Sequence, residues 1–147
     1  MSRIIIKIVT AADTWALRHR VLRPHLPVES ARYPEDSTRE AVHVAALDGE
    51  LVVGIASIYR EDEAGQSDSG AWRLRGMATA PEVRGTGLGG EILEEVIAQM
   101  KDRGASKIWC NARTSVAGFY ERYGFAVFGE EYEMPGIGPH YLMKTFL

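Results

Sequence analysis

The stretch RGTGLGG at residues 84–90 places four glycines directly before the apolar and acidic run EILEEVIAQM at residues 91–100. Read from Gly85, the glycines follow the dinucleotide-binding pattern G-x-G-x-x-G. Read from Arg84, the same residues follow R-x-x-G-x-G, a different phosphate-binding pattern. The choice between these two interpretations decides both the fold and the chemistry that the sequence predicts.

The surroundings of the glycines argue against a dinucleotide site. Such a site follows a strand directly, and it needs an acidic residue about 20 positions further on to hold the ribose. Here Pro81 and three other residues separate the strand predicted at residues 71–79 from Arg84, and the next strand ends in Cys110-Asn111. A nicotinamide-dependent oxidoreductase is therefore disfavoured.

The stretch nevertheless has the physical properties of an anion site. Glycines let the backbone turn without Cβ clashes, so several N–H groups can face one point. A helix predicted to begin near Leu88 adds its unpaired N–H groups and the positive end of its dipole. Arg84 adds a guanidinium that suits phosphate oxygens. The alternative is a tight turn, but four glycines at a helix start favour a site for a pyrophosphate.

The elements around the glycines define the fold class. Apolar residues recur every four positions after the glycines, and Gly104 is a natural helix terminator; the apolar residues are Leu88, Ile92, Val96 and Met100. The hairpin signal Asp48-Gly49 joins two of the strands. Strands are predicted at residues 4–9, 41–47, 51–59, 71–79, 106–111, 125–128 and 141–147. Residues 24–40 form a loop or contain only a short helix.

Two further helices complete this pattern. One follows residues 10–13, and a short one begins near Thr114 and stops at Gly124; its apolar face would carry Val116, Phe119, Tyr120 and Tyr123. The expected fold is α/β of the α+β type. It has a single mixed, mostly antiparallel sheet with helices on both faces and one parallel strand–helix–strand crossover.

Length and composition predict one domain over residues 1–147 in the cytoplasm. The chain is long enough to bury a core, and a net charge of −3 gives no basic footprint for nucleic acid. One cysteine excludes an internal disulfide. No apolar run has the length of a membrane span or of a signal peptide core. The sequence leaves the oligomeric state open, with a homodimer compatible.

Two segments carry a resemblance to a known family. LRGMAT (residues 74–79), PE (81–82) and VRGTGLG (83–89) resemble motif A of the GNAT superfamily of acyl-CoA-dependent N-acyltransferases. NARTSVAGFYERYGF (111–125) resembles motif B of that superfamily. Their order and spacing, with an antiparallel hairpin upstream, make the match specific. It covers roughly residue 42 to the C-terminus, while residues 1–40 match only in element order.

The resemblance implies acetyl-CoA as co-substrate and no metal. The strand before the glycines would offer backbone groups to the pantetheine, and residues 84–90 would wrap the pyrophosphate. The next strand would splay away to admit the cofactor arm. Asn111 either touches the pantetheine or caps the strand end or the next helix. The expected cofactor-binding residues are Met77, Ala78, Thr79, Arg84, Gly85, Thr86, Gly87, Leu88, Gly89, Gly90 and Asn111.

Acyl transfer to an amine needs a neutral amine, a place for the oxyanion and a proton for the departing thiolate. The resemblance puts Tyr120 beside the thioester sulfur as the acid, whereas spacing alone makes it a packing residue. Tyr123 is the second candidate, and Cys110 is expected to be a small hydrophobe. No base can be singled out among Glu29, His43, Glu61 and His140.

Arg73 and Arg75 lie two apart, so they share a face of their strand. They suit either an acceptor carboxylate or cross-strand pairs with Glu or Asp. The acceptor would be shaped by residues 23–40, 61–69 and 135–140. The sequence thus predicts transfer of an acetyl group to a primary amine of a small molecule or peptide by direct attack. The alternative is a catalytically silent acyl-CoA-binding module.

Overall fold

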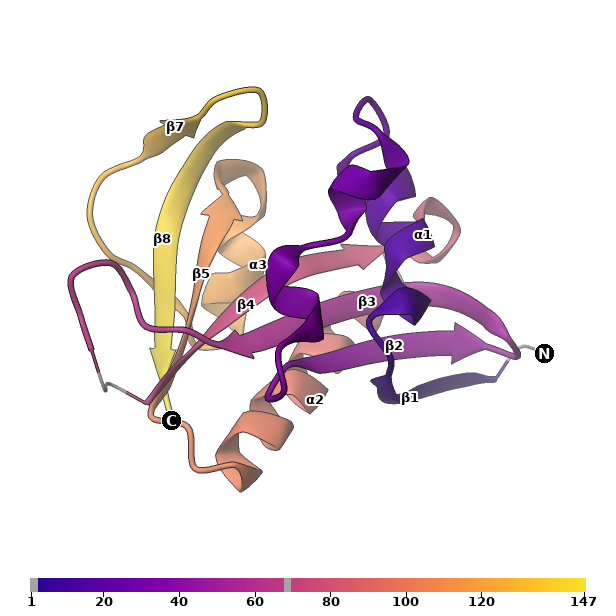
Figure 1. The fold of residues 1–147 in the computed structure, drawn as a ribbon, viewed down its shortest axis with the longest axis horizontal. Helices are drawn as coiled ribbons and strands as arrows, with labels where there is room; N and C mark the ends of the chain where they lie inside the picture. The colour runs from indigo at the N-terminus through magenta and orange to yellow at the C-terminus, as the bar shows by residue number, and fades with distance from the viewer. Residues whose placement is uncertain (1–2, 68–69) are drawn as a thin grey trace. The chain divides into compact units, whose positions relative to one another are not determined.

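The computed structural model describes residues 3–67 and 70–147 (Figure 1). The chain divides into two compact units: Met1–Tyr59 with Leu74–Gln99, and Arg60–Arg73 with Met100–Leu147. The prediction of one domain over residues 1–147 stays a prediction. No helix within the described residues is long and apolar enough to cross a membrane.

Within residues 3–67 and 70–147, one sheet contains eight strands in the order β1-β2-β3-β4-β5-β8-β6, with β7 paired to β8. The ladders β1–β2, β2–β3, β5–β8, β6–β8 and β7–β8 are antiparallel. The ladder between β4 and β5 is parallel, with the crossover through α2 (Leu88–Asp102). The strands are β1 (Ile4–Val9), β2 (Val42–Asp48), β3 (Leu51–Arg60), β4 (Ala71–Thr79), β5 (Lys107–Arg113), β6 (Ala126–Val127), β7 (Tyr132–Met134) and β8 (Gly138–Phe146).

In the first unit, α1 (Ala12–Leu22) and α2 cover opposite faces of the sheet (Figure 1). Successive residues of a strand point to opposite faces. In β3, a Cβ at Gly54 would collide with Ile92 of α2, whereas the hydroxyl of Ser57 accepts a hydrogen bond from Arg18 of α1. The expected mixed sheet with helices on both faces is confirmed.

The predicted helix after the glycines is confirmed in full. Its apolar stripe is buried, with Leu88, Ile92, Leu93, Val96 and Met100 all 4% exposed or less. Burial of each large side chain stabilises the fold by about 1.5–3 kcal/mol. Beyond the end of α2, Gly104 has a φ of +75°, and the Ala105 N–H donates to the carbonyl of Met100 at 3.0 Å. The helix therefore ends at its glycine.

In the second unit, the short helix differs from the prediction. A 3-10 turn, η4 (Thr114–Val116), precedes α3 (Ala117–Arg122). The tighter turn rotates the side chains relative to an α-helix that begins at Thr114. Val116 is therefore 42% exposed, and Ala117 takes the inward place beside Tyr120. The predicted apolar face is wrong at Val116.

The irregular backbone outside the helices and strands also includes three further 3-10 turns and one anchored loop. The loop 24–40 contains two 3-10 turns, η1 (Val28–Ala31) and η2 (Pro34–Ser37), and a third, η3 (Pro81–Val83), precedes the glycines. In the predicted loop 61–69, whose residues 68 and 69 lie outside the described residues, Glu63 is buried between two lysines. Its carboxylate pairs with Lys107 and Lys144 at 2.7 Å each, so this part of the loop is anchored to β5 and β8.

Candidate active site

The glycine loop of the first unit has a backbone that only glycine adopts easily. Gly85 and Gly87 have φ values of +80° and +84°. A Cβ added at either residue would meet no atom within 4 Å, so the space above the loop is open. Between them, the Thr86 hydroxyl donates to the carbonyl of Val83 at 2.6 Å and tightens the turn. The glycines thus serve both the turn and an uncovered backbone surface.

The amide hydrogens of this loop point to an anion-binding function. The first intrahelical bond of α2 runs from the Glu91 N–H to the carbonyl of Gly87 at 3.2 Å. For the backbone N–H groups of residues 85–90, no partner lies among the described residues. Residues 84–87 are also exposed. Unpaired N–H groups at the positive end of a 15-residue helix attract phosphate groups.

Gly76 gives strand β4 an irregular backbone just before Met77, Ala78 and Thr79. Its φ is +66°, although it lies inside a strand. A Cβ at this position would lie 2.9 Å from Nε of Arg18 and 3.4 Å from the Tyr33 ring. Sequence reasoning did not single this glycine out, although a glycine inside a strand pattern indicates a bulge or a close approach.

A buried ion pair lies beside Gly76 in the same unit. Arg18 is fully buried, and its guanidinium contacts the Asp36 carboxylate at 2.7 Å. Asp36 also accepts hydrogen bonds from the indole of Trp15 at 2.9 Å and the hydroxyl of Tyr59 at 2.6 Å. Burial raises the pKa of Asp36, but the bonds from Arg18, Tyr59 and Trp15 outweigh it and leave the pKa lowered. The cluster fixes η2 against α1 and β3.

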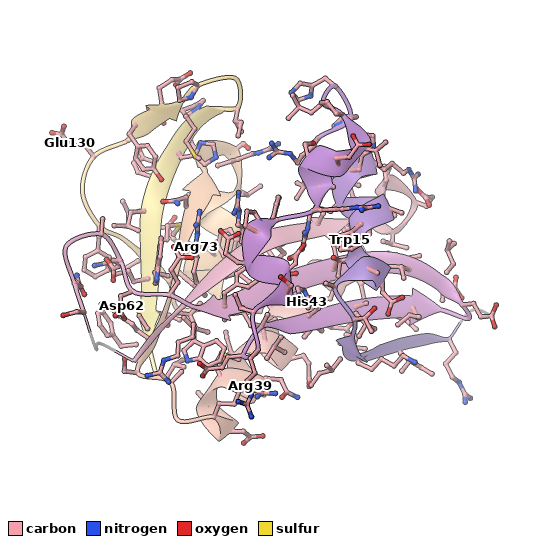
Figure 2. The ribbon with its side chains drawn as sticks, viewed as in Figure 1. Trp15, Arg39, His43, Asp62, Arg73 and Glu130 are labelled. Atoms are coloured by element: carbon pink, nitrogen blue, oxygen red, sulfur yellow. The ribbon has the colours of Figure 1, made fainter. Side chains whose placement is uncertain are left out.

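His43, one of the four base candidates, belongs to this cluster. His43 lies on β2 and Trp15 on α1, and Figure 2 labels both residues. The Nδ1 of His43 lies 2.7 Å from the Ser57 hydroxyl, and its Nε2 lies 3.2 Å from the backbone carbonyl of Asp36. Burial lowers the pKa of His43. Both ring nitrogens are engaged inside the protein, so His43 supports the fold.

The remaining base candidates have other surroundings. Glu29 is exposed, Glu61 pairs with Arg73 at 3.3 Å, and His140 is buried with Nδ1 2.8 Å from the carbonyl of Gly138. The structure therefore adds no argument for any of them as the base.

Arg73 and Arg75 both pair with glutamates, but these lie outside the strands, in η2 (Glu35) and just after β3 (Glu61), so the pairs are not the cross-strand pairs expected. Arg75 lies 3.1 Å from Glu35, and its guanidinium stacks 3.8 Å from the centre of the Tyr33 ring. The Arg73 guanidinium lies over Trp109 at 5.2 Å, in addition to its pair with Glu61. Both charges are already balanced by carboxylates within their own units.

In the second unit, Asn111 lies on β5 opposite Leu142 of β8. Its side-chain oxygen accepts a hydrogen bond from the Tyr132 hydroxyl. The following turn, η4, begins after Arg113 without a side-chain cap, so Asn111 does not cap it. No partner for the Asn111 amide nitrogen lies among the described residues.

Tyr120 lies inside the second unit on α3. Its ring meets Phe119 and Phe125 edge to face, with centroids 5.2 and 5.4 Å apart. Burial raises the pKa of the Tyr120 hydroxyl well above its ordinary value of 10. Cys110 is also buried, and burial raises the pKa of its thiol to about 12. The thiol is therefore protonated at neutral pH, as expected of a small hydrophobe.

The expected site residues thus fall into two groups. Met77 to Gly90 belong to the first unit, and Asn111 and Tyr120 belong to the second. Sequence reasoning missed Gly76, the Arg18–Asp36 pair and Tyr132. Within the described residues, no group of three or more His, Cys, Asp or Glu could hold a metal ion.

Comparison with known proteins identifies the family. The sequence profile of the acetyltransferase (GNAT) family matches residues 10–125. A relative from Bacillus subtilis (strain 168), named uncharacterized N-acetyltransferase YitI, is 33% identical over 142 residues. These residues cover 97% of this chain and 95% of the relative. The chain therefore belongs to the GNAT family of acetyltransferases, and it is an acyl-CoA-dependent N-acyltransferase.

Solved structures share the fold. Escherichia coli ElaA matches with a TM-score of 0.82 at 18% identity, over 97% of this chain and 99% of ElaA. An aminoglycoside 6′-N-acetyltransferase complexed with coenzyme A matches with a TM-score of 0.78 at 16% identity, over 97% of this chain and 96% of that one. At these identities the likeness is one of fold, and it agrees with the mixed sheet and the three α-helices found in the described residues.

Proposed function

We propose that this protein transfers an acetyl group from acetyl-CoA to a primary amine of a small molecule or peptide. The observation that carries the proposal is the open backbone at Gly85 and Gly87, with unpaired N–H groups at the start of α2. Those donors suit the pyrophosphate of coenzyme A. The named N-acetyltransferase relative and the coenzyme A complex of a structural neighbour support the same co-substrate.

The residues have separate roles in this proposal. Residues 84–90 bind the diphosphate, with the Arg84 guanidinium added to the backbone N–H groups. The backbone of Met77, Ala78 and Thr79 aligns the pantetheine arm, and the positive φ of Gly76 sets the direction in which that backbone continues. Asn111 contributes its amide nitrogen to the same arm. Acetyl-CoA supplies the activated acyl group, and no metal takes part.

The acceptor amine attacks the thioester directly. A free alkylamine has a pKa of about 10.4, so about one in two thousand molecules is neutral at pH 7. Deprotonation therefore adds about 4–5 kcal/mol to the barrier. Of the four base candidates, His43, Glu61 and His140 are engaged elsewhere and Glu29 is exposed. In this proposal, water molecules next to the amine carry the proton away.

Tyr120 donates a proton to the departing thiolate. A phenol with a pKa near 10 gives its proton to a thiolate with a pKa near 8.5 at an expense of about 2 kcal/mol. Burial raises the pKa of Tyr120 further, which keeps the hydroxyl protonated. Desolvation also destabilises a thiolate that forms beside Tyr120, and it therefore raises the pKa of the coenzyme A thiol as well. The free energy of the proton transfer depends on the difference between the pKa of the Tyr120 hydroxyl and that of the thiol.

Substitution of one glycine tests the cofactor site. Gly87→Ala adds a methyl group to the open surface and strains a φ of +84°. Gly49→Ala is the matched control, because Gly49 has a φ of +63° in the β2–β3 turn with no atom within 4 Å of an added Cβ. We expect Gly87→Ala alone to weaken coenzyme A binding at least tenfold by calorimetry. Equal binding by both variants would refute the site.

Turnover separates an enzyme from a silent binding module. A panel of amino acids, polyamines, small amines and peptide N-termini is incubated with acetyl-CoA, and release of free coenzyme A is measured. We expect release with at least one class of amine. Tight coenzyme A binding with no release across the panel would favour the binding module.

A further inference from the structure

Three strands of the second unit bring Tyr132, His140 and Asn111 to one face of the sheet. His140 of β8 lies opposite Arg113 of β5 and opposite Tyr132 of β7, so these two strands occupy the two edges of β8. Asn111 is two residues before Arg113. Opposite residues, and residues two apart on a strand, share a face. Tyr132 therefore reaches diagonally across β8 toward Asn111.

The contacts of Tyr132 hold its ring independently of its hydroxyl. The ring stacks on His140, with centroids 6.1 Å apart and planes at 29°. His140 is 4% exposed, and its Nδ1 lies 2.8 Å from the carbonyl of Gly138. The neighbouring Glu131 accepts a hydrogen bond from the Thr114 hydroxyl at 2.7 Å. Removal of the hydroxyl alone therefore leaves the ring in place.

The hydroxyl of Tyr132 fixes the orientation of the Asn111 amide. A carboxamide has an acceptor end and a donor end, and the phenol O–H donates to the acceptor, Oδ1. The donor end, Nδ2, then points away from Tyr132 with hydrogens to give. Such an amide, ordered before the ligand arrives, loses less conformational freedom when it binds a carbonyl oxygen.

We propose that Tyr132 is a positioning residue for the acyl-CoA arm: it holds Asn111 so that Nδ2 donates to an amide carbonyl of the pantetheine. This inference rests on the proposed function, because it requires the cofactor arm at Asn111. It assigns a role to β7, the strand that sequence reasoning missed. It also explains why an exposed tyrosine, 37% accessible, directs its hydroxyl to a strand side chain.

The test is a double-mutant cycle on coenzyme A binding, measured by calorimetry. The variants are Y132F, N111A and the double variant, with Y141F as the matched control. Tyr141 lies on the neighbouring β8, and no side-chain hydrogen bond of its hydroxyl lies among the described residues. We expect Y132F to raise the Kd about three- to tenfold, the range of one hydrogen bond. We also expect its KM for acetyl-CoA to rise more than its kcat falls.

In the double variant, we expect a Kd no weaker than that of N111A, because Tyr132 acts through Asn111. A Y132F protein that binds like the wild type, or losses that multiply in the double variant, would overturn the positioning role. The Gly87→Ala variant distinguishes a failure of the Tyr132 inference from a failure of the whole proposed cofactor site. If it weakens binding while N111A and Y132F do not, this inference fails together with the proposed Asn111 contact, and the diphosphate site at residues 84–90 stands. If none of these variants changes binding, the proposed cofactor site fails as well.

Discussion

The guanidinium of Arg18 and the carboxylate of Asp36 lie 2.7 Å apart with side chains 0% and 4% exposed. The two residues come from α1 and η2, which the sequence separates by a proline-bearing loop. Arg18 also donates to the carbonyl of Ala31 at 2.7 Å and to the hydroxyl of Ser57 at 2.8 Å. Such a buried charge is tolerated only while its partner is present.

Asp36→Asn should therefore destabilise the protein strongly. It leaves the Arg18 charge buried without a counterion, which costs about 3–5 kcal/mol in comparable pairs. Glu35→Gln is the control, since the adjacent Glu35–Arg75 pair is partly exposed and should contribute only about 0–1 kcal/mol. Urea unfolding at pH 7 measures both. Equal losses for the two variants would contradict a special role for the buried pair.

His43 should make stability depend on pH just below neutrality. The unfolded chain takes up this proton near pH 6.5, whereas burial lowers the folded pKa. The unfolded state therefore binds more protons below pH 6.5, and the free energy of unfolding falls as the pH falls toward the folded pKa. We expect H43Q to flatten this decline between about pH 7 and 5. The same substitution at exposed His25 should leave the decline unchanged; identical slopes for wild type and H43Q would refute the assignment.

Gly76→Ala should destabilise the folded protein for two reasons, an unfavourable φ and a steric clash. The residue would be held at a φ of +66°, and its Cβ would lie 2.9 Å from Nε of Arg18, whose guanidinium is fixed by Asp36 and Ser57. Gly49→Ala carries the first penalty alone, about 1–2 kcal/mol. We expect a larger loss at Gly76, read as a lower thermal midpoint. A midpoint equal to that of Gly49→Ala would mean that Arg18 moves aside freely.

The sequence predicted those elements whose signals are local. The hairpin turn at Gly49 and the end of α2 at Gly104 follow from glycines with φ values of +63° and +75°. The phase of α3 was wrong at Val116 because a 3-10 turn replaced the first α-helical turn. Strand β7 has three residues, too few for an alternating pattern to be recognised.

The candidate site, like the fold, could be predicted from the sequence only where its residues lie close together along the chain. The glycine loop could be found because one short segment contains the whole motif. The cluster of Arg18, Asp36 and Ser57 could not, since hydrogen bonds join residues 18 to 39 positions apart. Tyr132 likewise meets Asn111 across a separation of 21 residues. Tyr132 and Asn111 are brought together only by the register of β8 between β5 and β7.

Tyr120→Phe tests the acid in the proposed mechanism. The substitution removes the hydroxyl and keeps the edge-to-face contacts with Phe119 and Phe125. We expect kcat to fall about 10²–10⁴-fold, the usual contribution of a positioned acid, with coenzyme A affinity spared. Because burial raises the pKa of Tyr120, the wild type should show no alkaline loss of kcat from this group below about pH 10. Tyr123→Phe, whose ring packs on Phe119 at 5.3 Å, is the control and should keep its turnover. Unchanged turnover in Tyr120→Phe would remove its hydroxyl from the mechanism and leave the residue as part of the core.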